Sequence, residues 1–338
     1  MPLFGLLSND IAIDLGTANT LIYMKGKGIV LNEPSIVTYD VNSRKIIAIG
    51  EEAKKMVGKV HKELNTIRPM RDGVIADFEM AEIMIKEFIK KIMPGVFPAR
   101  RIVVCVPSGI TEVEKRAVRD TCERIGAKEV HLISEPMAAA IGIGLDVHAP
   151  YGNMIVDIGG GTTEIAVIAL SGITNVVSIK TAGDELTDAI IRFFRSNQNM
   201  LIGERTAEDI KHQAGSVMPL EEEVIIEVKG RDLVAGVPKL TEVSSIEIRE
   251  SLNPTVTQMI ESMKVALEKT APELSSDILS RGIFLTGGGA LLQGLDERIK
   301  VETGVPVHIA EDPLTAVVRG TGKVLEDLNY YKKCMQKR

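Results

Sequence analysis

The stretch Met154–Thr163, MIVDIGGGTT, has a counterpart near the N-terminus in Ile11–Thr20, IAIDLGTANT. Each stretch is a short apolar run that ends in an aspartate, an apolar residue and a glycine, with a threonine at the sixth position after the aspartate. A single copy is compatible with an ordinary strand followed by a turn. Two copies, one in each half of the chain, indicate a duplicated functional element.

The residue types of this element predict a phosphate site. An apolar run bounded by glycine predicts a buried strand, and the small residues after it allow a tight turn whose N–H groups face an anion. Two such loops predict a triphosphate held from both sides. Asp14 and Asp157, at the two strand ends, predict a magnesium ion bound through water, because Mg²⁺ dehydrates reluctantly and is usually shared between carboxylates and phosphates.

Size and composition limit the class of protein. A chain of 338 residues with 45% hydrophobic residues predicts two or more globular domains. The formal net charge of −6 argues against a nucleic-acid partner. We expect a reducing cytoplasm, because Cys105, Cys122 and Cys334 are scattered and odd in number and the N-terminus has no secretory signal pattern. No run approaches the roughly 18 apolar residues of a membrane span.

Two short apolar segments have two interpretations each. The first is PLFGLL at residues 2–7, and the second is the Pro- and Gly-flanked tip after residue 93. Both segments either pack onto the protein or contact a membrane surface, where many copies on one filament would bind well although one copy binds weakly. The side chains concerned are Leu3, Phe4, Leu6, Leu7, Val96 and Phe97.

Periodicity predicts the remaining elements. Phe78–Met93 has the apolar spacing of an amphipathic helix. The C-terminal helix expected over Thr315–Leu328 contains Gly320 and Gly322, which indicates close packing there. Other expected elements are helices over Glu51–Val60 and Ser251–Glu268 and strands near 224–228, 233–235 and 240–243.

Further candidate site residues follow predicted strands. Glu135 comes after the predicted strand Val130–Ile133 and before an Ala-rich helix, so its carboxylate is expected in the same crevice as the phosphate loops and suits orienting a water. A third glycine run, Gly287–Gly289, leaves room for a flat ligand. Glu208 and Lys211, three apart on a predicted helix, have the spacing of a surface ion pair.

Longer motifs identify a resemblance. DLGTANT, RPMRDGVIADFE, EPMAAAIG, VDIGGGTTE, GERTAEDIK and RGIFLTGGGALLQGL are similar to the MreB-like bacterial actins of the actin, Hsp70 and sugar kinase superfamily, over roughly residues 9–328. The resemblance implies an α/β actin-like, duplicated ribonuclease H-like fold: two similar halves with a nucleotide cleft between them, each carrying a small insertion.

The resemblance also implies four subdomains. Subdomain IA would comprise residues 1–32, 70–145 and 315–338, and subdomain IB residues 33–69. Subdomain IIA would comprise residues 146–183 and 250–314, and subdomain IIB residues 184–249.

The resemblance also implies roles for the residues of this sequence that match the site positions of the family. Glu135 would position the hydrolytic water with Thr162 assisting, and Asp14 and Asp157 would hold magnesium through water. The residues implied in ATP binding are Thr17, Ala18, Asn19, Gly159, Gly160, Gly161, Thr162, Gly183, Glu208, Asp209, Ile210, Lys211, Gly288, Gly289, Ala290 and Leu291.

For function, the resemblance implies an ATP- and Mg²⁺-dependent cytoskeletal protein with slow ATP hydrolysis. It would form antiparallel double filaments on the inner face of the cytoplasmic membrane, with cell-wall elongation membrane proteins as partners, and maintain rod shape. A sugar kinase would need a polar pocket for its sugar, and the sequence has no obvious run of polar residues suited to one. An Hsp70-type chaperone would need a further substrate-binding domain. A scaffold that binds ATP without hydrolysing it stays open.

Overall fold

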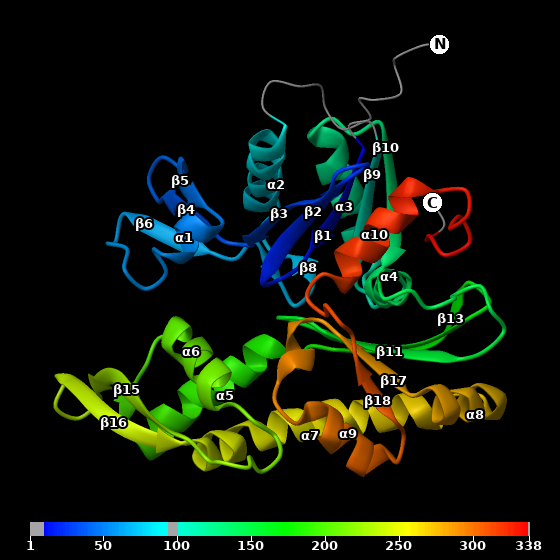
Figure 1. The fold of residues 1–338 in the computed structure, drawn as a ribbon. Coiled ribbons are helices and arrows are strands. Elements are labelled where there is room, and N and C mark those ends of the chain that lie inside the picture. Colours follow the sequence, from blue (N-terminus) through cyan, green and yellow to red (C-terminus); the bar gives the residue numbers. More distant parts are fainter. Residues whose placement is uncertain (1–9, 94–100, 337–338) are drawn as a thin grey trace.

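The computed structural model describes residues 10–93 and 101–336, which form two lobes built on sheets of the same topology (Figure 1). The first-lobe sheet has the order β10-β9-β1-β2-β3, and the second-lobe sheet has the order β18-β17-β11-β12-β13. In both, the first strand along the chain pairs antiparallel with the next and parallel with a later strand. The predicted α/β fold of two similar halves is confirmed.

The first lobe consists of one main sheet with helices on its faces and two smaller sheets. Its main strands are β1 (Ile11–Leu15), β2 (Asn19–Met24), β3 (Gly28–Pro34), β9 (Arg101–Val106) and β10 (Glu129–Ser134). Its helices are α1 (Glu51–Lys54), α2 (Phe78–Ile92), α3 (Glu112–Arg124), α4 (Glu135–Gly142) and the C-terminal α10 (Ala316–Glu326). Its smaller strands are β4 (Val37–Asp40), β5 (Ile46–Ile49), β6 (Leu64–Ile67), β7 (Met70–Arg71) and β8 (Val74–Ile75).

The second lobe repeats this plan. Its main strands are β11 (Asn153–Ile158), β12 (Thr163–Ala169), β13 (Gly172–Ile179), β17 (Ile283–Thr286) and β18 (Val307–Ile309). Its helices are α5 (Gly183–Asn197), α6 (Glu204–Ala214), α7 (Ser245–Glu268), α8 (Pro272–Arg281), the 3₁₀ helix η2 (Gly288–Leu291) and α9 (Leu295–Thr303). A small sheet contains β14 (Met200–Leu201), β15 (Ile225–Asp232) and β16 (Pro238–Ser244).

Strand alternation decides which way Asp14 faces. Ile11 and Ile13 on β1 pack into the core beneath α2 and α3, whereas Ala12 packs into the core that contains α4 and α10. Because successive side chains of a strand point to opposite faces, Asp14 lies on the Ala12 face. The carboxylate is therefore directed toward the side of the sheet that α4 covers.

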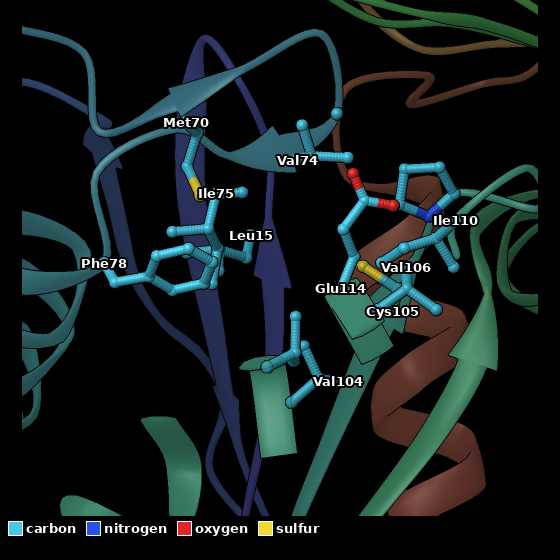
Figure 2. Close-up of a pocket in the computed structure, with 13 residues that line it drawn as sticks. Leu15, Met70, Val74, Ile75, Phe78, Val104, Cys105, Val106, Ile110 and Glu114 are labelled. Atoms are coloured by element: carbon cyan, nitrogen blue, oxygen red, sulfur yellow. The ribbon is translucent and has the colours of Figure 1, made fainter. Parts of the chain in front are cut away.

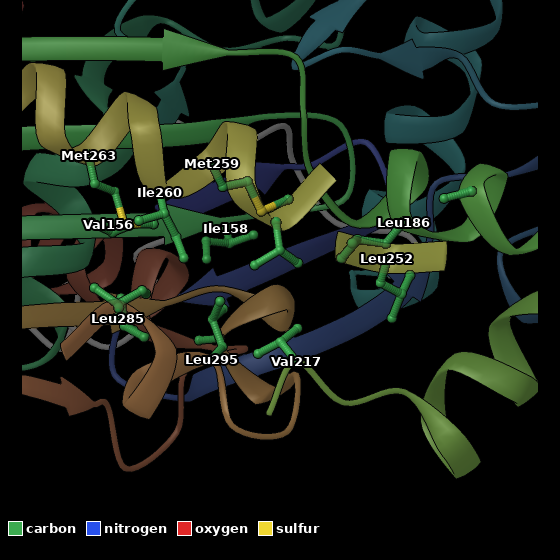
Figure 3. Packing of buried hydrophobic residues seen from close by; sticks show 14 of the residues in the cluster. Val156, Ile158, Leu186, Val217, Leu252, Met259, Ile260, Met263, Leu285 and Leu295 are labelled. Atoms are coloured by element: carbon green, nitrogen blue, oxygen red, sulfur yellow. The ribbon is translucent and has the colours of Figure 1, made fainter. Parts of the chain in front are cut away.

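The second lobe places Asp157 in the same way. Val156 and Ile158 on β11 pack into the second-lobe core, which contains residues of α5 and α7 (Figure 3). Ile155 instead joins the core that contains α4 and α10. Asp157 lies on the Ile155 face. Both aspartates consequently face the layer between the two sheets.

Helix α4 occupies that layer and packs tightly against α10. A Cβ at Gly142 would lie 1.8 Å from the Ala316 carbonyl oxygen, and one at Gly320 would lie 1.7 Å from the Ala138 carbonyl oxygen. At Gly322 a Cβ would lie 2.7 Å from the Tyr23 ring. The close packing expected from the two glycines of α10 is confirmed.

Three predicted elements differ from the structure. The helix expected over Glu51–Val60 ends at Lys54, before a turn at Gly58 with φ +71°. Residues 233–235 form a turn rather than a strand, because the Asp232 carboxylate accepts backbone hydrogen bonds from residues 234 and 235. Helix α7 begins at Ser245 instead of Ser251, since Ser244 and Glu247 form a capping box.

No helix among the described residues is long and apolar enough to cross a membrane. The six predicted membrane-contact side chains, Leu3, Phe4, Leu6, Leu7, Val96 and Phe97, lie outside the described residues. The four subdomain boundaries stay predictions.

The α4–α10 contact predicts a strong effect of a single methyl group. Gly320→Ala should lower the free energy of unfolding by about 3 kcal/mol or more, because the added Cβ overlaps a backbone oxygen that cannot move without displacing α4. Urea unfolding of the purified protein measures this change. Gly172→Ala, where the added Cβ would make an ordinary 3.8 Å contact, is the control. Equal stability of the two variants would contradict the prediction.

Candidate functional site

The two duplicated loops have the same hairpin register. Leu15 pairs with Thr20 across the first hairpin, and Ile158 pairs with Thr163 across the second. The threonine at the sixth position after each aspartate is therefore the residue that closes the hairpin. The loops between these pairs are Gly16–Asn19 and Gly159–Thr162.

The loops of the two lobes lie against each other. A Cβ at Gly160 would lie 2.9 Å from the Ala18 Cβ, and one at Gly161 would lie 2.7 Å from Thr17 Oγ1. Glycine is thus required at both positions for the loops to approach. The predicted phosphate-binding residues of the two halves, which are far apart in sequence, are brought together.

The hairpin within the motif RPMRDGVIADFE, which the sequence analysis quoted only for its resemblance, contacts both loops. Asp72 and Gly73 form the turn between β7 and β8, with φ values of 51° and 76°. The Gly73 N–H donates to Thr17 Oγ1 at 3.0 Å, and a Gly73 Cβ would lie 3.0 Å from Thr162 Cγ2. An Asp-Gly pair is a strong signal for this turn, so the hairpin was recognisable, although its contacts were not.

Both aspartates have raised pKa values. Burial raises the pKa of Asp14 to about 6, although the Cys105 Sγ donates to its Oδ1 at 3.1 Å. The pKa of Asp157 is raised to about 7, mainly by burial. A 2.8 Å hydrogen bond from Thr286 Oγ1 acts in the opposite direction, and the negative charge of Asp14 contributes to the increase. The two carboxylates therefore share an environment that disfavours negative charge.

Two glutamates belong to the same cluster. Glu135 is the first residue of α4, and burial followed by the charges of Glu164, Asp157 and Asp14 raises its pKa well above the ordinary value. Glu164 on β12 is fully buried, and burial raises its pKa as well. The sequence analysis proposed Glu135 and missed Glu164. The signal available for Glu164 was a charged residue inside an otherwise buried strand.

The start of α5 is held by residues of α6. Lys211 Nζ donates to the Gly183 carbonyl oxygen at 3.0 Å, to Thr187 Oγ1 at 2.8 Å and to Glu208 Oε1 at 2.7 Å. Gly183 N–H in turn donates to the Gly159 carbonyl oxygen of the second loop at 3.1 Å. The Glu208–Lys211 pair is thus part-buried and connected to the phosphate loop, and the surface interpretation of its spacing is wrong.

The remaining predicted site residues lie partly in the core and partly on the surface. A Cβ at Gly289 would lie 2.2 Å from Ile158 Cγ2, so the third glycine run packs on the end of β11. Ala290 and Ile210 are buried in the second-lobe core, whereas Leu291 and Asp209 are exposed. Asn19 begins β2, next to Ala18.

Two ion pairs connect the lobes around the loops. Arg68, which follows β6, pairs with Glu204 at the start of α6. Lys180 Nζ lies 3.5 Å from Asp72 Oδ2, with both side chains exposed, so this pair adds little stability. The exposed Lys180–Asp72 pair is therefore a minor part of the contact between the halves.

A small apolar pocket lies beside the first loop (Figure 2). It is lined by Leu15 of β1, by Cys105 and Val106 of β9, and by Val74 of the β7–β8 hairpin, with Glu114 of α3 at its edge. Gly73, whose N–H contacts the first loop, also lines the pocket. Its apolar lining does not suit a phosphate.

The donor set between the lobes fits a nucleotide with a magnesium ion. The loops Gly16–Asn19 and Gly159–Thr162 offer backbone N–H groups, and Asp14 and Asp157 offer carboxylates that face the layer between the two sheets. No group of three or more His, Cys, Asp or Glu side chains suited to a metal occurs within the described residues. Two carboxylates supplemented by phosphate oxygens match the usual ligation of Mg²⁺.

The raised pKa of Asp157 predicts a pH dependence of stability. Since the folded pKa of about 7 exceeds the ordinary 3.8, the folded protein binds the extra proton, and this stability is lost as pH rises through 7. Between about pH 5 and pH 8 the free energy of unfolding of the nucleotide-free wild type should fall by about 3 kcal/mol more than that of the Asp157→Asn variant. Chemical unfolding at both pH values measures it, with Asp188→Asn on the exposed face of α5 as control. Parallel pH profiles of wild type and Asp157→Asn would contradict it.

Comparison with known proteins agrees with this geometry. Residues 8–333 match the MreB/Mbl protein family. The chain is 52% identical to the cell shape-determining protein MreB of Escherichia coli over 333 residues, which is 97% of this chain and 96% of the relative. It is 48% identical to the cell shape-determining protein Mbl of Bacillus subtilis over 329 residues, which is 97% of this chain and 99% of the relative.

Solved structures agree as well. The crystal structure of MreB5 of Spiroplasma citri bound to ADP superposes with a TM-score of 0.91 at 38% identity, covering 96% of this chain and 97% of that one. The same protein bound to AMPPNP matches with the same TM-score. These likenesses confirm the predicted actin-like fold. With two duplicated loops, matching sheets and near full-length similarity, the chain belongs to the MreB/Mbl family.

Proposed function

We propose that this protein is an ATP-dependent cytoskeletal protein that polymerises into filaments and maintains cell shape. The single observation that carries the proposal is the direct contact of two corresponding hairpin loops from separate lobes, Gly16–Asn19 and Gly159–Thr162. ATP bound there would touch both lobes at once, so its binding energy would favour one lobe arrangement. The names of the relatives, cell shape-determining proteins, support the biological role.

ATP and Mg²⁺ are the ligands that we assign to this site. MreB5 of Spiroplasma citri has been solved with ADP and with AMPPNP, which supports an adenine nucleotide here. Mg²⁺ would neutralise phosphate charge and would be held through water by Asp14 and Asp157. Thr17, Ala18 and Asn19 would contact the phosphates from one lobe and Gly159, Gly160, Gly161 and Thr162 from the other. Gly183, Glu208, Asp209, Ile210 and Lys211 would border the adenosine opposite Gly288, Gly289, Ala290 and Leu291.

In hydrolysis, Glu135 would accept a hydrogen bond from the attacking water. Burial raises the pKa of Glu135 above the ordinary carboxyl value, and a raised pKa makes the carboxylate form a stronger base. Thr162, next to the Gly73 turn, would assist at the phosphate end. The proposed activity is a weak ATPase tied to filament turnover, because the loss of the last phosphate removes one contact between the lobes.

Glu135→Ala should separate binding from hydrolysis. We expect ATP affinity within about two-fold of wild type and phosphate release slowed roughly a hundred-fold, since a general base contributes at least that much. Filaments of the variant should also last longer. Phosphate release and nucleotide titration measure the two effects, and Glu123→Ala on the exposed face of α3 is the control. Unchanged turnover in Glu135→Ala would remove Glu135 from this role.

The location proposed for the filaments is the inner face of the cytoplasmic membrane, as antiparallel double filaments that organise cell-wall elongation proteins. Leu3, Phe4, Leu6, Leu7, Val96 and Phe97 are the proposed membrane contacts. Each buried apolar side chain contributes about 1.5 to 3 kcal/mol at most, so the repeated contacts of a filament would be needed for firm attachment.

Electron microscopy tests the polymer and the membrane contact together. Purified protein with ATP and Mg²⁺ should form paired filaments lying flat on anionic lipid monolayers, and a sample without nucleotide should not. Deletion of residues 2–7 should reduce lipid binding and spare filaments in solution. Phosphate release without any filaments would overturn the cytoskeletal proposal, and equal lipid binding by the truncated protein would refute the membrane contact.

A further inference from the structure

Glu164 breaks the similarity of the two duplicated hairpins. It lies opposite Asp157 in the β11–β12 pair, and the matching position in the first lobe, opposite Asp14, is Leu21. Leu21 is 5% exposed and Glu164 is 0% exposed. Because the first hairpin forms with a leucine at this position, the hairpin itself does not need a carboxylate there.

Each lobe provides a hydrogen-bond donor for this carboxylate. The backbone N–H of Ser108, in the first-lobe turn after β9, donates to Glu164 Oε2 at 2.9 Å. The Ser178 hydroxyl, on β13 of the second lobe, donates to Glu164 Oε1. A fully buried carboxylate is costly unless its oxygens are paired, so separating the lobes would leave Oε2 without its donor.

The turn that provides the first-lobe donor is seated on the second lobe. A Cβ at Gly109 would lie 3.5 Å from the Ser178 Cβ, so this turn is in van der Waals contact with β13. Pro107, on the other side of Ser108, would lie 2.7 Å from a Cβ at Gly73 of the β7–β8 hairpin. The Ser108 turn therefore joins Glu164 to the hairpin that contacts both phosphate loops.

Glu164 also lies within electrostatic reach of the proposed catalytic carboxylate. Among the charges that raise the pKa of Glu135, that of Glu164 has the largest effect, ahead of Asp157 and Asp14. A change in the position of Glu164 would thus change the electrostatic environment of Glu135.

We propose that Glu164 is a positioning residue that holds the lobes closed around the phosphate loops by accepting the Ser108 N–H across the lobe interface. This inference rests on the proposed ATP-dependent function. The role of Glu164 is to couple the arrangement of the lobes to the phosphate loops through the Ser108 turn.

The test measures the distance between the lobes directly. Spin labels at Glu79→Cys on α2 and Asp188→Cys on α5 report the separation by pulsed electron resonance, since both positions are exposed and the native cysteines are buried. Protein is measured below the concentration for assembly, with and without AMPPNP and Mg²⁺. Glu164→Leu removes the acceptor, and Glu164→Gln keeps an acceptor oxygen without the charge.

We expect Glu164→Leu to give a longer and broader distance distribution in both conditions, and Glu164→Gln to match wild type with AMPPNP. Steady-state hydrolysis should fall at least about ten-fold in Glu164→Leu, the effect of losing one hydrogen bond to a charged group, with KM for ATP changed less than kcat. Glu164→Gln should recover most of that rate. Glu33→Leu is the matched control, because the Glu33 carboxylate also accepts a backbone N–H, from Glu51 at 2.8 Å, but within one lobe.

A wild-type distance distribution in Glu164→Leu would overturn the proposal, and so would a Glu164→Gln variant as open as Glu164→Leu. Ser108→Pro keeps the carboxylate and removes the first-lobe N–H at the second position of the Pro107–Ile110 turn, where proline is tolerated. It should broaden the distribution as Glu164→Leu does, it provides the test if Glu164→Leu does not fold, and a wild-type distribution in Ser108→Pro would also overturn the proposal. The distance measurement does not require hydrolysis. Absence of ATPase activity in wild type would therefore refute the proposed function while the distances still decide the role of Glu164.

Discussion

The structure depends on the packing of α4 between the two sheets. The core around this helix contains Ala12 from the first sheet and Ile155 from the second, and α10 closes it from the side. The backbones of α4 and α10 approach so closely that Gly142 and Gly320 leave no room for a Cβ. Close packing of this kind joins the two sheets through one helix, because a packed interior deforms little. The contact between the phosphate loops depends on that junction.

The same arrangement gathers negative charge at one end of α4. Asp14, Asp157, Glu135 and Glu164 all have raised pKa values, and burial is the largest cause in each. Such a cluster is unfavourable in the protein alone, since buried charges need partners. A magnesium ion with a nucleotide would supply positive charge and fixed dipoles at this place. In our proposal, the cost of the cluster is offset only when the ligand is bound.

Duplication accounts for most of the site, and divergence accounts for the rest. The two loops share hairpin length and register, and each presents its aspartate to the central layer. The halves differ where Leu21 corresponds to Glu164, and where the second loop is tied to α5 through Gly183. The β7–β8 hairpin contacts both loops, but its Gly73 N–H donates its hydrogen bond to the first loop, at Thr17. The same structural element thus serves two different surroundings.

The sequence by itself determined the duplicated loops, the fold class and the place of Glu135 at the start of α4. These features depend on local patterns: an apolar run before glycine, strand alternation and a carboxylate between a strand and a helix. Helix limits were misjudged at the start of α7, which the Ser244 capping box sets, and at the end of α1, which is followed by a turn containing Gly58 at positive φ.

Only the tertiary structure decided the contacts of Glu164, the Asp72–Gly73 turn and Lys211. Their partners lie in other elements, and for Glu164 and the turn some lie in the other lobe. No periodicity or spacing along the chain encodes such pairs, because they form when two separately folded sheets are brought to the same helix.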